Sequence, residues 1–351
     1  MKKNLLVTGG CGFIGSAFIK QYINSYKDSF IINVDSLTYA GDLENTKEFS
    51  SLSNYKHIKA DIQDYSLMRH LISEYQINYL VNFAAESHVD RSIKNPDVFL
   101  QSNINGTLQL LKACYETWME GPNYYKSNCR DNVFLQVSTD EVYGTLQLSS
   151  QDASFTETSN YLPNSPYSAS KAGAELFIRS FSKTYGLNVL TTSCSNNYGE
   201  RQNEEKLIPH VITQSLLNKD ISIHGEGKNI RDWLYVEDHC EAIIAVLHSN
   251  ASSGSKYNIG GGDDSEKNNI EVVNAICECM DKLHPMNGNR SYKSLIRFVK
   301  DRPGNDLKYS VDISKIKRDL NWEPTTSFDV GLKKVVQWYI DRFQSRKIPI
   351  C

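Results

Sequence analysis

The chain has 351 residues, a length that corresponds to about two domains or to one large α/β domain with an appended part. Hydrophobic residues make up 40% of it and charged residues 23%, a composition that is typical of globular proteins and excludes a disordered or collagen-like chain. The 38 Lys and Arg against 41 Asp and Glu give a net charge of −3, so the basic excess of a nucleic-acid-binding protein is missing and we expect a small-molecule partner.

Short apolar runs alternate with amphipathic segments in the first half of the chain, which predicts a parallel sheet with crossover helices. We expect a surface loop at Trp118–Asn132. The expected strands lie at Leu5–Val7, Phe30–Val34, Tyr55–Ile58, Tyr79–Phe83, Val133–Val137 and Val189–Thr192. The expected helices lie at Phe13–Tyr26, Tyr65–Tyr75, Val98–Trp118 and Tyr167–Tyr185.

This alternation breaks down in the second half of the chain. The Gly- and charge-rich segment Gly260–Asn269 is typical of a loop. The remaining expected elements are strands at Ile221–His224 and Lys256–Ile259 and helices at Leu207–Leu217, Val236–Leu247, Glu271–Leu283 and Val330–Phe343.

The sequence contains no signal for a membrane span, a disulfide framework or a metal site. No run reaches about 18 apolar residues, and Met1–Asn4 leads directly into a short apolar run and a glycine turn, unlike a signal peptide. We therefore expect a cytoplasmic protein without membrane association. The eight cysteines are scattered along the chain, so we expect no disulfide framework. Cys277 and Cys279 fit a helical face rather than a CxxC pair, and the histidines lack the spacing of metal ligands, so we expect no metal.

A glycine turn connects the first expected strand to the first expected helix. Gly9, Gly12 and Gly15 form a GxxGxxG pattern, which lets the backbone approach a pyrophosphate at a helix N-terminus. Asp35 ends the second expected strand 20 residues after Gly15, where a carboxylate can accept hydrogen bonds from ribose hydroxyls. Because a carboxylate repels a 2′-phosphate, the pattern predicts NAD rather than NADP.

Tyr167 and Lys171 are four residues apart at the start of an expected helix, directly after Pro166. Residues at this spacing lie on the same helix face. A lysine ammonium near a tyrosine stabilises the phenolate, which makes the tyrosine a usable base near neutral pH.

Two adjacent carboxylates follow the strand expected at Val133–Val137. Asp140 and Glu141 come at its carboxyl end, within Ser138–Gly144, and in an open α/β sheet that end faces the ligand crevice. Removal of water needs one group that takes a proton from carbon and another that donates one to the departing hydroxyl. Asp140 and Glu141 can divide these roles.

These motifs together resemble the extended short-chain dehydrogenase/reductase family, and within it the nucleotide-sugar 4,6-dehydratases, over nearly the whole chain. The motifs are TGGCGFIGS at 8–16, VDSLTYAGDLEN at 34–45, FAAESHVDRSI at 83–93, STDEVYG at 138–144, SPYSASKA at 165–172, CSNNYG at 194–199, EKLIP at 205–209, IRDWLYVEDH at 230–239 and DRPGND at 301–306.

The resemblance implies an α/β fold, with a Rossmann-type doubly wound parallel sheet and a smaller C-terminal α/β domain that binds substrate. Residues 1–193 would mainly bind NAD and residues 194–351 mainly the nucleotide sugar, with a segment near 234–260 returning to the first domain. It also implies a homodimer formed through helices Val98–Trp118 and Tyr167–Tyr185.

The implied reaction removes water from a nucleotide-activated glucose on one tightly held NAD and gives the 4-keto-6-deoxy sugar. Tyr167 would take the proton of the 4-hydroxyl while Thr139 contacts the same oxygen, and Lys171 would support Tyr167. Glu141 would then remove the C5 proton while Asp140 protonates the departing C6 hydroxyl.

The resemblance also implies binding residues, matched position by position. Cofactor contacts would come from Gly9, Gly12, Phe13, Ile14, Gly15, Asp35, Ser36, Leu37, Thr38, Asp61, Ile62, Ala84, Ala85, Glu86, Ser87, Ser102, Tyr167, Lys171 and Asn197. Substrate contacts would come from Ser87, Thr139, Asn196, Lys206, Leu207, Ser222, Ile223, His224, Arg231, Asn269, Asp301, Arg302 and Asn305. Arginines bind phosphate oxygens in a fork, so we expect Arg231 and Arg302 to contact the substrate pyrophosphate.

Three departures from the family pattern lie in the substrate half. The first is in the DRPGND motif, where Asn305 and the later Lys308 replace an expected histidine and arginine. The second is residues 199–204, which replace an expected aromatic segment, and the third is the loop Gly260–Asn269, which is about two residues longer than the family pattern. The resemblance implies a dTDP-activated glucose, and because these departures lie in the half that binds the nucleotide, a UDP-activated glucose stays open as the alternative. A nucleotide-sugar 4-epimerase and a non-catalytic NAD sensor are the competing functions; the Asp140–Glu141 pair disfavours the epimerase, and the intact Thr139, Tyr167 and Lys171 disfavour the sensor.

Overall fold

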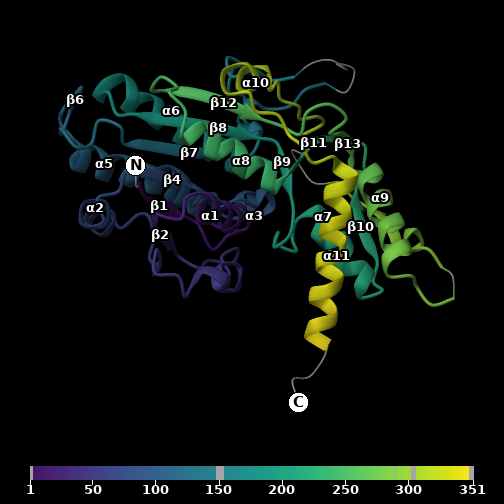
Figure 1. Ribbon diagram of the computed structural model, residues 1–351. Helices are drawn as coiled ribbons and strands as arrows, with labels where there is room; N and C mark the ends of the chain where they lie inside the picture. The colour runs from purple at the N-terminus through teal and green to yellow at the C-terminus, as the bar shows by residue number, and fades with distance from the viewer. Residues whose placement is uncertain (1–2, 148–153, 289, 302–305, 348–351) are drawn as a thin grey trace.

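A seven-stranded parallel sheet forms the larger lobe of the protein, for which a computed structural model describes residues 3–147, 154–288, 290–301 and 306–347 (Figure 1). The strands lie in the order β12-β8-β7-β4-β1-β2-β3. Their bounds are β1 Asn4–Thr8, β2 Phe30–Asp35, β3 Tyr55–Lys59, β4 Tyr79–Asn82, β7 Val133–Thr139, β8 Val189–Cys194 and β12 Ser255–Ile259. The strand order reverses between β1 and β4, and in such a sheet ligands bind outside the carboxyl ends at the reversal.

Helices cover both faces of this sheet because most of its strands are apolar on both sides. On one face, α1 and α8 pack through Phe18, Ile19, Tyr22 and Ile243. On the other face, α2, α5 and α6 contribute Met68, Leu110, Leu111 and Ile178. The bounds are α1 Phe13–Ser25, α2 Tyr65–Glu74, α5 Thr107–Trp118, α6 Pro166–Ser180 and α8 Val236–Leu247.

The smaller lobe has a separate core made of Tyr198, Trp233, Ile276, Val335 and neighbouring side chains. Its three-stranded sheet has the order β13-β11-β9, and β10 pairs with β14 in parallel. The strands are β9 Asn196–Tyr198, β10 Ile221–His224, β11 Ile230–Tyr235, β13 Glu266–Asn268 and β14 Ile296–Val299. The helices are α7 Leu207–Leu216, α9 Asn269–Leu283 and α11 Phe328–Lys347.

Short elements complete the chain. They are the helices α3 Val89–Lys94, α4 Pro96–Phe99 and α10 Ser314–Leu320, the strands β5 Met119–Gly121 and β6 Tyr124–Tyr125, and the helical turns η1 Leu43–Phe49, η2 Leu100–Gly106, η3 Asp140–Tyr143, η4 Phe181–Tyr185 and η5 Tyr292–Leu295.

The predicted fold class is confirmed, and three local predictions need correction. The segment expected as a loop at Trp118–Asn132 holds the β5–β6 hairpin, and Gly260–Asn269 contains β13. The helix expected at Val98–Trp118 begins at Pro96 and passes through a π-helical turn, η2. These strands have two or three residues, which is too short for a periodic pattern to show them.

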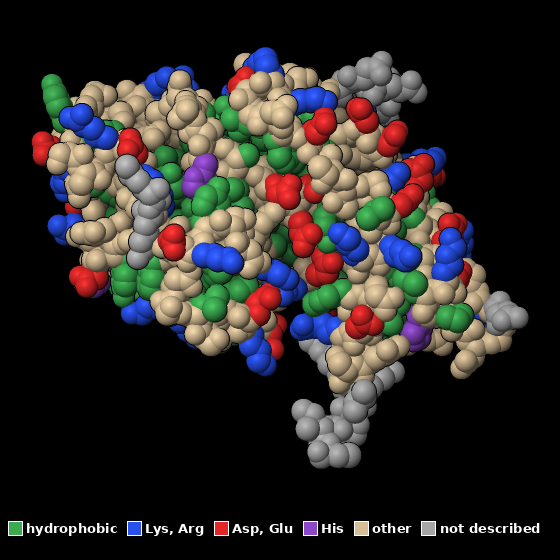
Figure 2. All heavy atoms as spheres, in the orientation of Figure 1, with side chains coloured by type: hydrophobic (Ala, Val, Ile, Leu, Met, Phe, Trp, Pro, Cys, Tyr) green, Lys and Arg blue, Asp and Glu red, His purple; other side chains and the backbone are tan. Residues whose placement is uncertain are grey.

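Two surface observations bear on partners. Within the described residues, no helix is long and apolar enough to cross a membrane. On the face drawn in Figure 2, Lys and Arg side chains are intermingled with Asp and Glu rather than gathered in one basic patch.

Candidate active site

A cavity of about 800 Å³ opens where the strand order reverses. Its walls come from the β1–α1 turn, from the ends of β2, β4 and β7, from α6, and from residues 194–206 that lead into the smaller lobe. A cavity of this size holds a ligand larger than a single sugar or base.

The glycine turn leaves no room for side chains between β1 and α1. Gly9 has a φ of 68°, and a Cβ there would lie 2.7 Å from the backbone nitrogen of Ala84. A Cβ on Gly15 would lie 2.3 Å from the Gly9 carbonyl oxygen. Gly12 begins α1 without a side-chain cap, so the helix N-terminus presents its N–H groups to the cavity. These features fit a dinucleotide pyrophosphate.

Asp35 ends β2 and lines the same cavity. Its carboxylate is buried and accepts hydrogen bonds from the backbone N–H groups of Cys11, at 2.9 Å, and Leu37, at 2.8 Å. These two donors hold the carboxylate in one orientation. A fixed carboxylate at this position fits the ribose of an adenosine.

Tyr167 and Lys171 lie on the first two turns of α6. Ser165 and Ser168 form a capping box at the helix start, and Pro166 occupies the first turn, so the local sequence fixes where the helix begins. The Lys171 ammonium donates to the Val137 carbonyl at 2.8 Å. Burial lowers the pKa of Lys171 to about 8, against the opposing effect of the Glu175 carboxylate. Burial, and next the negative charge of Glu141, raise the pKa of Tyr167 well above its ordinary value.

Thr139, Asp140 and Glu141 follow one another from the end of β7 into η3. The Thr139 hydroxyl accepts from the Glu141 N–H at 3.3 Å and donates to Asp140 Oδ1 at 3.2 Å. The Asp140 side chain is buried, and its Oδ2 has no hydrogen-bond partner among the described residues. Burial, and then the carboxylates of Glu141 and Asp232, raise the pKa of Asp140 well above its ordinary value. A raised pKa suits Asp140 to hold and donate a proton, and the less buried Glu141 beside it is suited to accept one.

The structure brings most of the residues predicted as site residues to the walls of this cavity. They are Gly9, Gly12, Phe13, Ile14, Gly15, Asp35, Ser36, Thr38, Asp61, Ile62, Ala84, Ala85, Glu86, Ser87, Ser102, Thr139, Asp140, Glu141, Tyr167, Lys171, Asn196, Asn197 and Lys206.

The remaining predicted residues are not among those that line the cavity. Leu37 stands between two lining residues in a left-handed conformation, with φ at 55°. Arg302 and Asn305 lie outside the described residues. The predicted substrate residues that do not line the cavity are Leu207, Ser222, Ile223, His224, Arg231, Asn269 and Asp301.

Two of these residues have clear structural partners. Ile223 is buried in the core of the smaller lobe. The Arg231 guanidinium donates to the carbonyls of Asp306, at 2.9 Å, and Leu307, at 3.4 Å, and stacks 4.4 Å from the ring centroid of Tyr309. Arg231 thus fixes the segment that follows residue 305 against β11.

Sequence reasoning missed several cavity residues. Cys194 and Ser195 lie at the carboxyl end of β8, where the strand-end rule that identified Asp140 would also have found them. The others are Val34, Ala40, Gly41, Ala60, Gln63, Phe83, Asn95, Asp97, Val98, Gln101, Val137, Ser138, Gln202, Asn203 and Glu205. Within the described ranges, no group of three or more His, Cys, Asp and Glu side chains could hold a metal ion.

Comparison with known proteins agrees with this site. The profile of the family described as GDP-mannose 4,6 dehydratase matches residues 6–335, so the chain belongs to this family of sugar-nucleotide-modifying enzymes. Curated relatives include the dTDP-glucose 4,6-dehydratase of Xanthomonas campestris pv. campestris strain B100, 47% identical over 95% of this chain and 92% of the relative. The dTDP-glucose 4,6-dehydratase of Neisseria gonorrhoeae is 45% identical over 99% of this chain and 98% of its own.

Solved structures give the same result. The dTDP-glucose 4,6-dehydratase of Bacillus anthracis, in complex with NAD, superposes with a TM-score of 0.84 at 41% identity, covering 97% of this chain and 98% of the other. The Streptomyces venezuelae dTDP-glucose 4,6-dehydratase with NAD and TYD bound has a TM-score of 0.86 at 39% identity, with the same coverage. A UDP-glucose 4-epimerase from Thermotoga maritima is a more distant neighbour, at 26% identity and a TM-score of 0.82. The family resemblance expected from the sequence is confirmed.

Proposed function

We propose that the chain is an NAD-dependent lyase that removes water from dTDP-glucose and gives the 4-keto-6-deoxy sugar nucleotide. The observation that supports this most strongly is the buried Asp140 beside Glu141, in the same cavity as Tyr167 and Lys171. A protonated acid next to a second carboxyl is what elimination of water requires, and an enzyme that only oxidises or epimerises does not need it.

The cofactor is NAD, and the glycine turn and Asp35 fit it. Gly9, Gly12 and Gly15 would hold its pyrophosphate, and Asp35 would accept from the adenosine ribose. Bound NAD supplies the hydride acceptor for sugar C4 and the hydride donor for C6, so the reaction needs no external oxidant.

Tyr167 takes the proton of the sugar 4-hydroxyl in the first step. Only the phenolate can accept that proton, so the phenol must first release its own proton to solvent, against the effect of burial and Glu141, which raise its pKa. The Lys171 ammonium, held by the Val137 carbonyl, stabilises the phenolate that must form. Thr139 lies beside both Tyr167 and Asp140, where its hydroxyl would contact the same sugar oxygen.

Asp140 and Glu141 perform the second step. A ketone at C4 acidifies the C5 proton, which Glu141 removes as the base. Asp140 donates its proton to the C6 hydroxyl, the C6–O bond breaks, and water leaves. The hydride then returns to C6, and C5 takes back a proton.

The residues between the two lobes are suited to hold the nucleotide sugar. The Lys206 ammonium at the start of α7 donates to the carbonyl of Ser87 at 3.1 Å, and Asn196 lines the cavity on the same side. We infer that residues 1–193, with the returning segment near 234–260, form the NAD-binding part and the rest forms the sugar-nucleotide part. A cytoplasmic location stays a prediction from the sequence.

An exposed apolar surface on the larger lobe supports a homodimer. Large apolar side chains stand exposed on α3, α4, η2 and α6, among them Ile93, Val98, Leu100, Leu176 and Phe177. A patch of this kind is typical of an interface. Light scattering should show a dimer for the native chain and a monomer for Leu176→Glu, whereas a monomeric native chain would contradict the assignment.

Incubation of the protein and NAD with dTDP-glucose and UDP-glucose, side by side, tests the proposed function. We expect mass spectrometry to show loss of one water from dTDP-glucose and slower loss from UDP-glucose. A product of unchanged mass with inverted C4 would identify an epimerase. An unchanged substrate, with NAD bound, would favour the sensor.

A further inference from the structure

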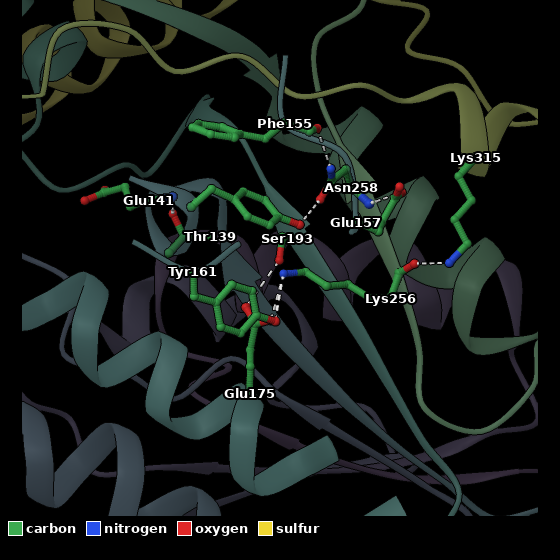
Figure 3. A network of polar contacts seen from close by, with 11 residues as sticks. Thr139, Glu141, Phe155, Glu157, Tyr161, Glu175, Ser193, Lys256, Asn258 and Lys315 are labelled. Atoms are coloured by element: carbon green, nitrogen blue, oxygen red, sulfur yellow. Dashed lines mark hydrogen bonds and ion pairs between the residues drawn. The ribbon is translucent and has the colours of Figure 1, made fainter. Parts of the chain in front are cut away.

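Lys256 is a buried lysine that lies outside the active-site cavity. Its side chain is 11% exposed, and its ammonium lies 2.8 Å from the Glu175 carboxylate, whose side chain is 2% exposed (Figure 3). The same ammonium donates to the Tyr161 hydroxyl at 3.2 Å. Burying both charges costs solvation, so such a pair needs close partners on every side.

Two aromatic rings surround the Lys256 ammonium, at 4.2 Å from the Tyr143 centroid and 4.6 Å from the Tyr161 centroid. Cation–π contacts of this kind strengthen when they are desolvated. Tyr143 is the last residue of η3, the turn that begins with Asp140 and Glu141, and its hydroxyl donates to Asn258 Oδ1 at 2.7 Å. Lys256 therefore contacts the element that holds the acid and the base.

Glu175 connects Lys256 to the helix that carries Tyr167 and Lys171. It lies on α6, four residues after Lys171 and eight after Tyr167, so the three side chains share one helix face. Its Oε1 accepts from Ser193 at 3.3 Å, and its Oε2 accepts from the Tyr161 hydroxyl. Through Glu175 and Tyr143, Lys256 connects α6 to η3.

We propose that Lys256, paired with Glu175, is a positioning residue that holds η3, with Asp140 and Glu141, in register with the Tyr167 face of α6. The inference rests on the proposed function, because it assigns to Lys256 an effect on the removal of water. Tyr167 and Lys171 are placed by their own helix and by the Val137 carbonyl, so the oxidation at C4 depends less on Lys256.

The test compares Lys256→Met, the double variant Lys256→Met/Glu175→Gln, and Lys315→Met as a matched control. Lys315 donates to the backbone carbonyl of Lys256 and stacks 4.5 Å from the Tyr257 centroid, so it supports the same strand without touching η3 or α6. Lys256→Met alone leaves the buried Glu175 carboxylate without its ion-pair partner, so we expect a lower Tm. The double variant removes both charges, so it should recover the Tm.

Single turnovers with dTDP-glucose separate the two chemical steps. In the double variant we expect dehydration to slow about 10- to 100-fold, because small misplacements cost rates of this order. Because the Glu175 carboxylate also acts on Lys171, oxidation at C4 is compared with that of Glu175→Gln alone and should stay within about twofold of it, so NADH accumulates. Hydrogen exchange at residues 140–143 should be faster than in the native chain, and Lys315→Met should behave as the native chain in all three readouts.

Three results would overturn the inference. These are native dehydration in the double variant, equal slowing of both steps, and unchanged exchange in η3. A native chain that removes no water would instead overturn the proposed function, and this inference with it, so the native control separates the two failures.

Discussion

The cofactor side and the substrate side of the cavity differ in how directly their residues follow from the sequence. On the cofactor side, Gly9, Gly15 and Asp35 lie where their motif places them. On the substrate side, Arg231 binds backbone carbonyls and Ile223 is buried in a separate core. Residues within one strand–turn–helix unit are positioned by their immediate neighbours. Residues from separate loops are positioned by contacts that the local sequence does not encode.

Glu141→Gln is expected to have the largest effect. The amide cannot accept the C5 proton, so dehydration should fall about 100- to 10,000-fold, the usual contribution of general acid–base catalysis. NAD binding should be unchanged, because the glycine turn and Asp35 are untouched. Product formation by mass spectrometry and NAD titration by calorimetry measure the two quantities. Full turnover by this variant would refute the assignment of the base.

Tyr167→Phe should stop the reaction one step earlier. The phenylalanine ring keeps the packing but removes the hydroxyl, so C4 oxidation should slow by about the same factor. Stopped-flow absorbance should then show no NADH. In Glu141→Gln, by contrast, oxidation is intact and NADH should appear. Normal NADH formation would exclude Tyr167 as the base.

Asp35→Ala probes the cofactor side alone. Loss of a charged acceptor costs about 1.5–3 kcal/mol, so the Kd for NAD should rise roughly 10- to 100-fold. The exposed Asp28→Ala is the control. An unchanged Kd in the Asp35 variant would mean that the carboxylate serves only the N–H groups of Cys11 and Leu37.

Arg231→Lys probes the substrate side. A lysine cannot replace the forked donation to Asp306 and Leu307, so we expect a lower Tm together with a several-fold higher KM for the sugar nucleotide. The Kd for NAD should stay the same. A higher KM with an unchanged Tm would identify Arg231 chiefly as a phosphate ligand. The substrate side would then follow from its motif as directly as the cofactor side does.

His239 is expected to affect stability alone. Burial lowers its pKa to about 3, and its Nδ1 lies 2.8 Å from Asn197 Oδ1. Between that value and the ordinary pKa of about 6.5, the unfolded chain binds a proton that the native chain does not. Stability from this group is present above about pH 6.5 and is lost as the pH falls, at about 1.4 kcal/mol per unit. Denaturant unfolding at a series of pH values gives the free energy of unfolding, which should fall less steeply with decreasing pH in His239→Gln than in the native chain. The exposed His70→Gln is the control. An equal pH dependence in the His239 variant and the native chain would contradict this assignment.

The sequence was sufficient for the sheet and for the reacting groups, because both depend on local patterns. Apolar runs identified β1 to β4, and the strand-end position identified Asp140 before its burial was known. The raised pKa of Asp140 could not be predicted, since it depends first on burial and then on the carboxylates of Glu141 and of Asp232 from β11. The strand β11 was missed because Ile230–Tyr235 has no alternating pattern, and β9 and β13 were missed because three residues are too few to show one.

The most direct test of the central claim follows the hydrogen of C4. If one bound NAD serves both steps in this cavity, dTDP-glucose deuterated at C4 must give a product with deuterium in the new C6 methyl group. Mass spectrometry of the product, with fragmentation to locate the label, should show this retention. Loss of the deuterium to solvent would contradict the account. So would a sugar that has lost no water and still carries the deuterium at C4.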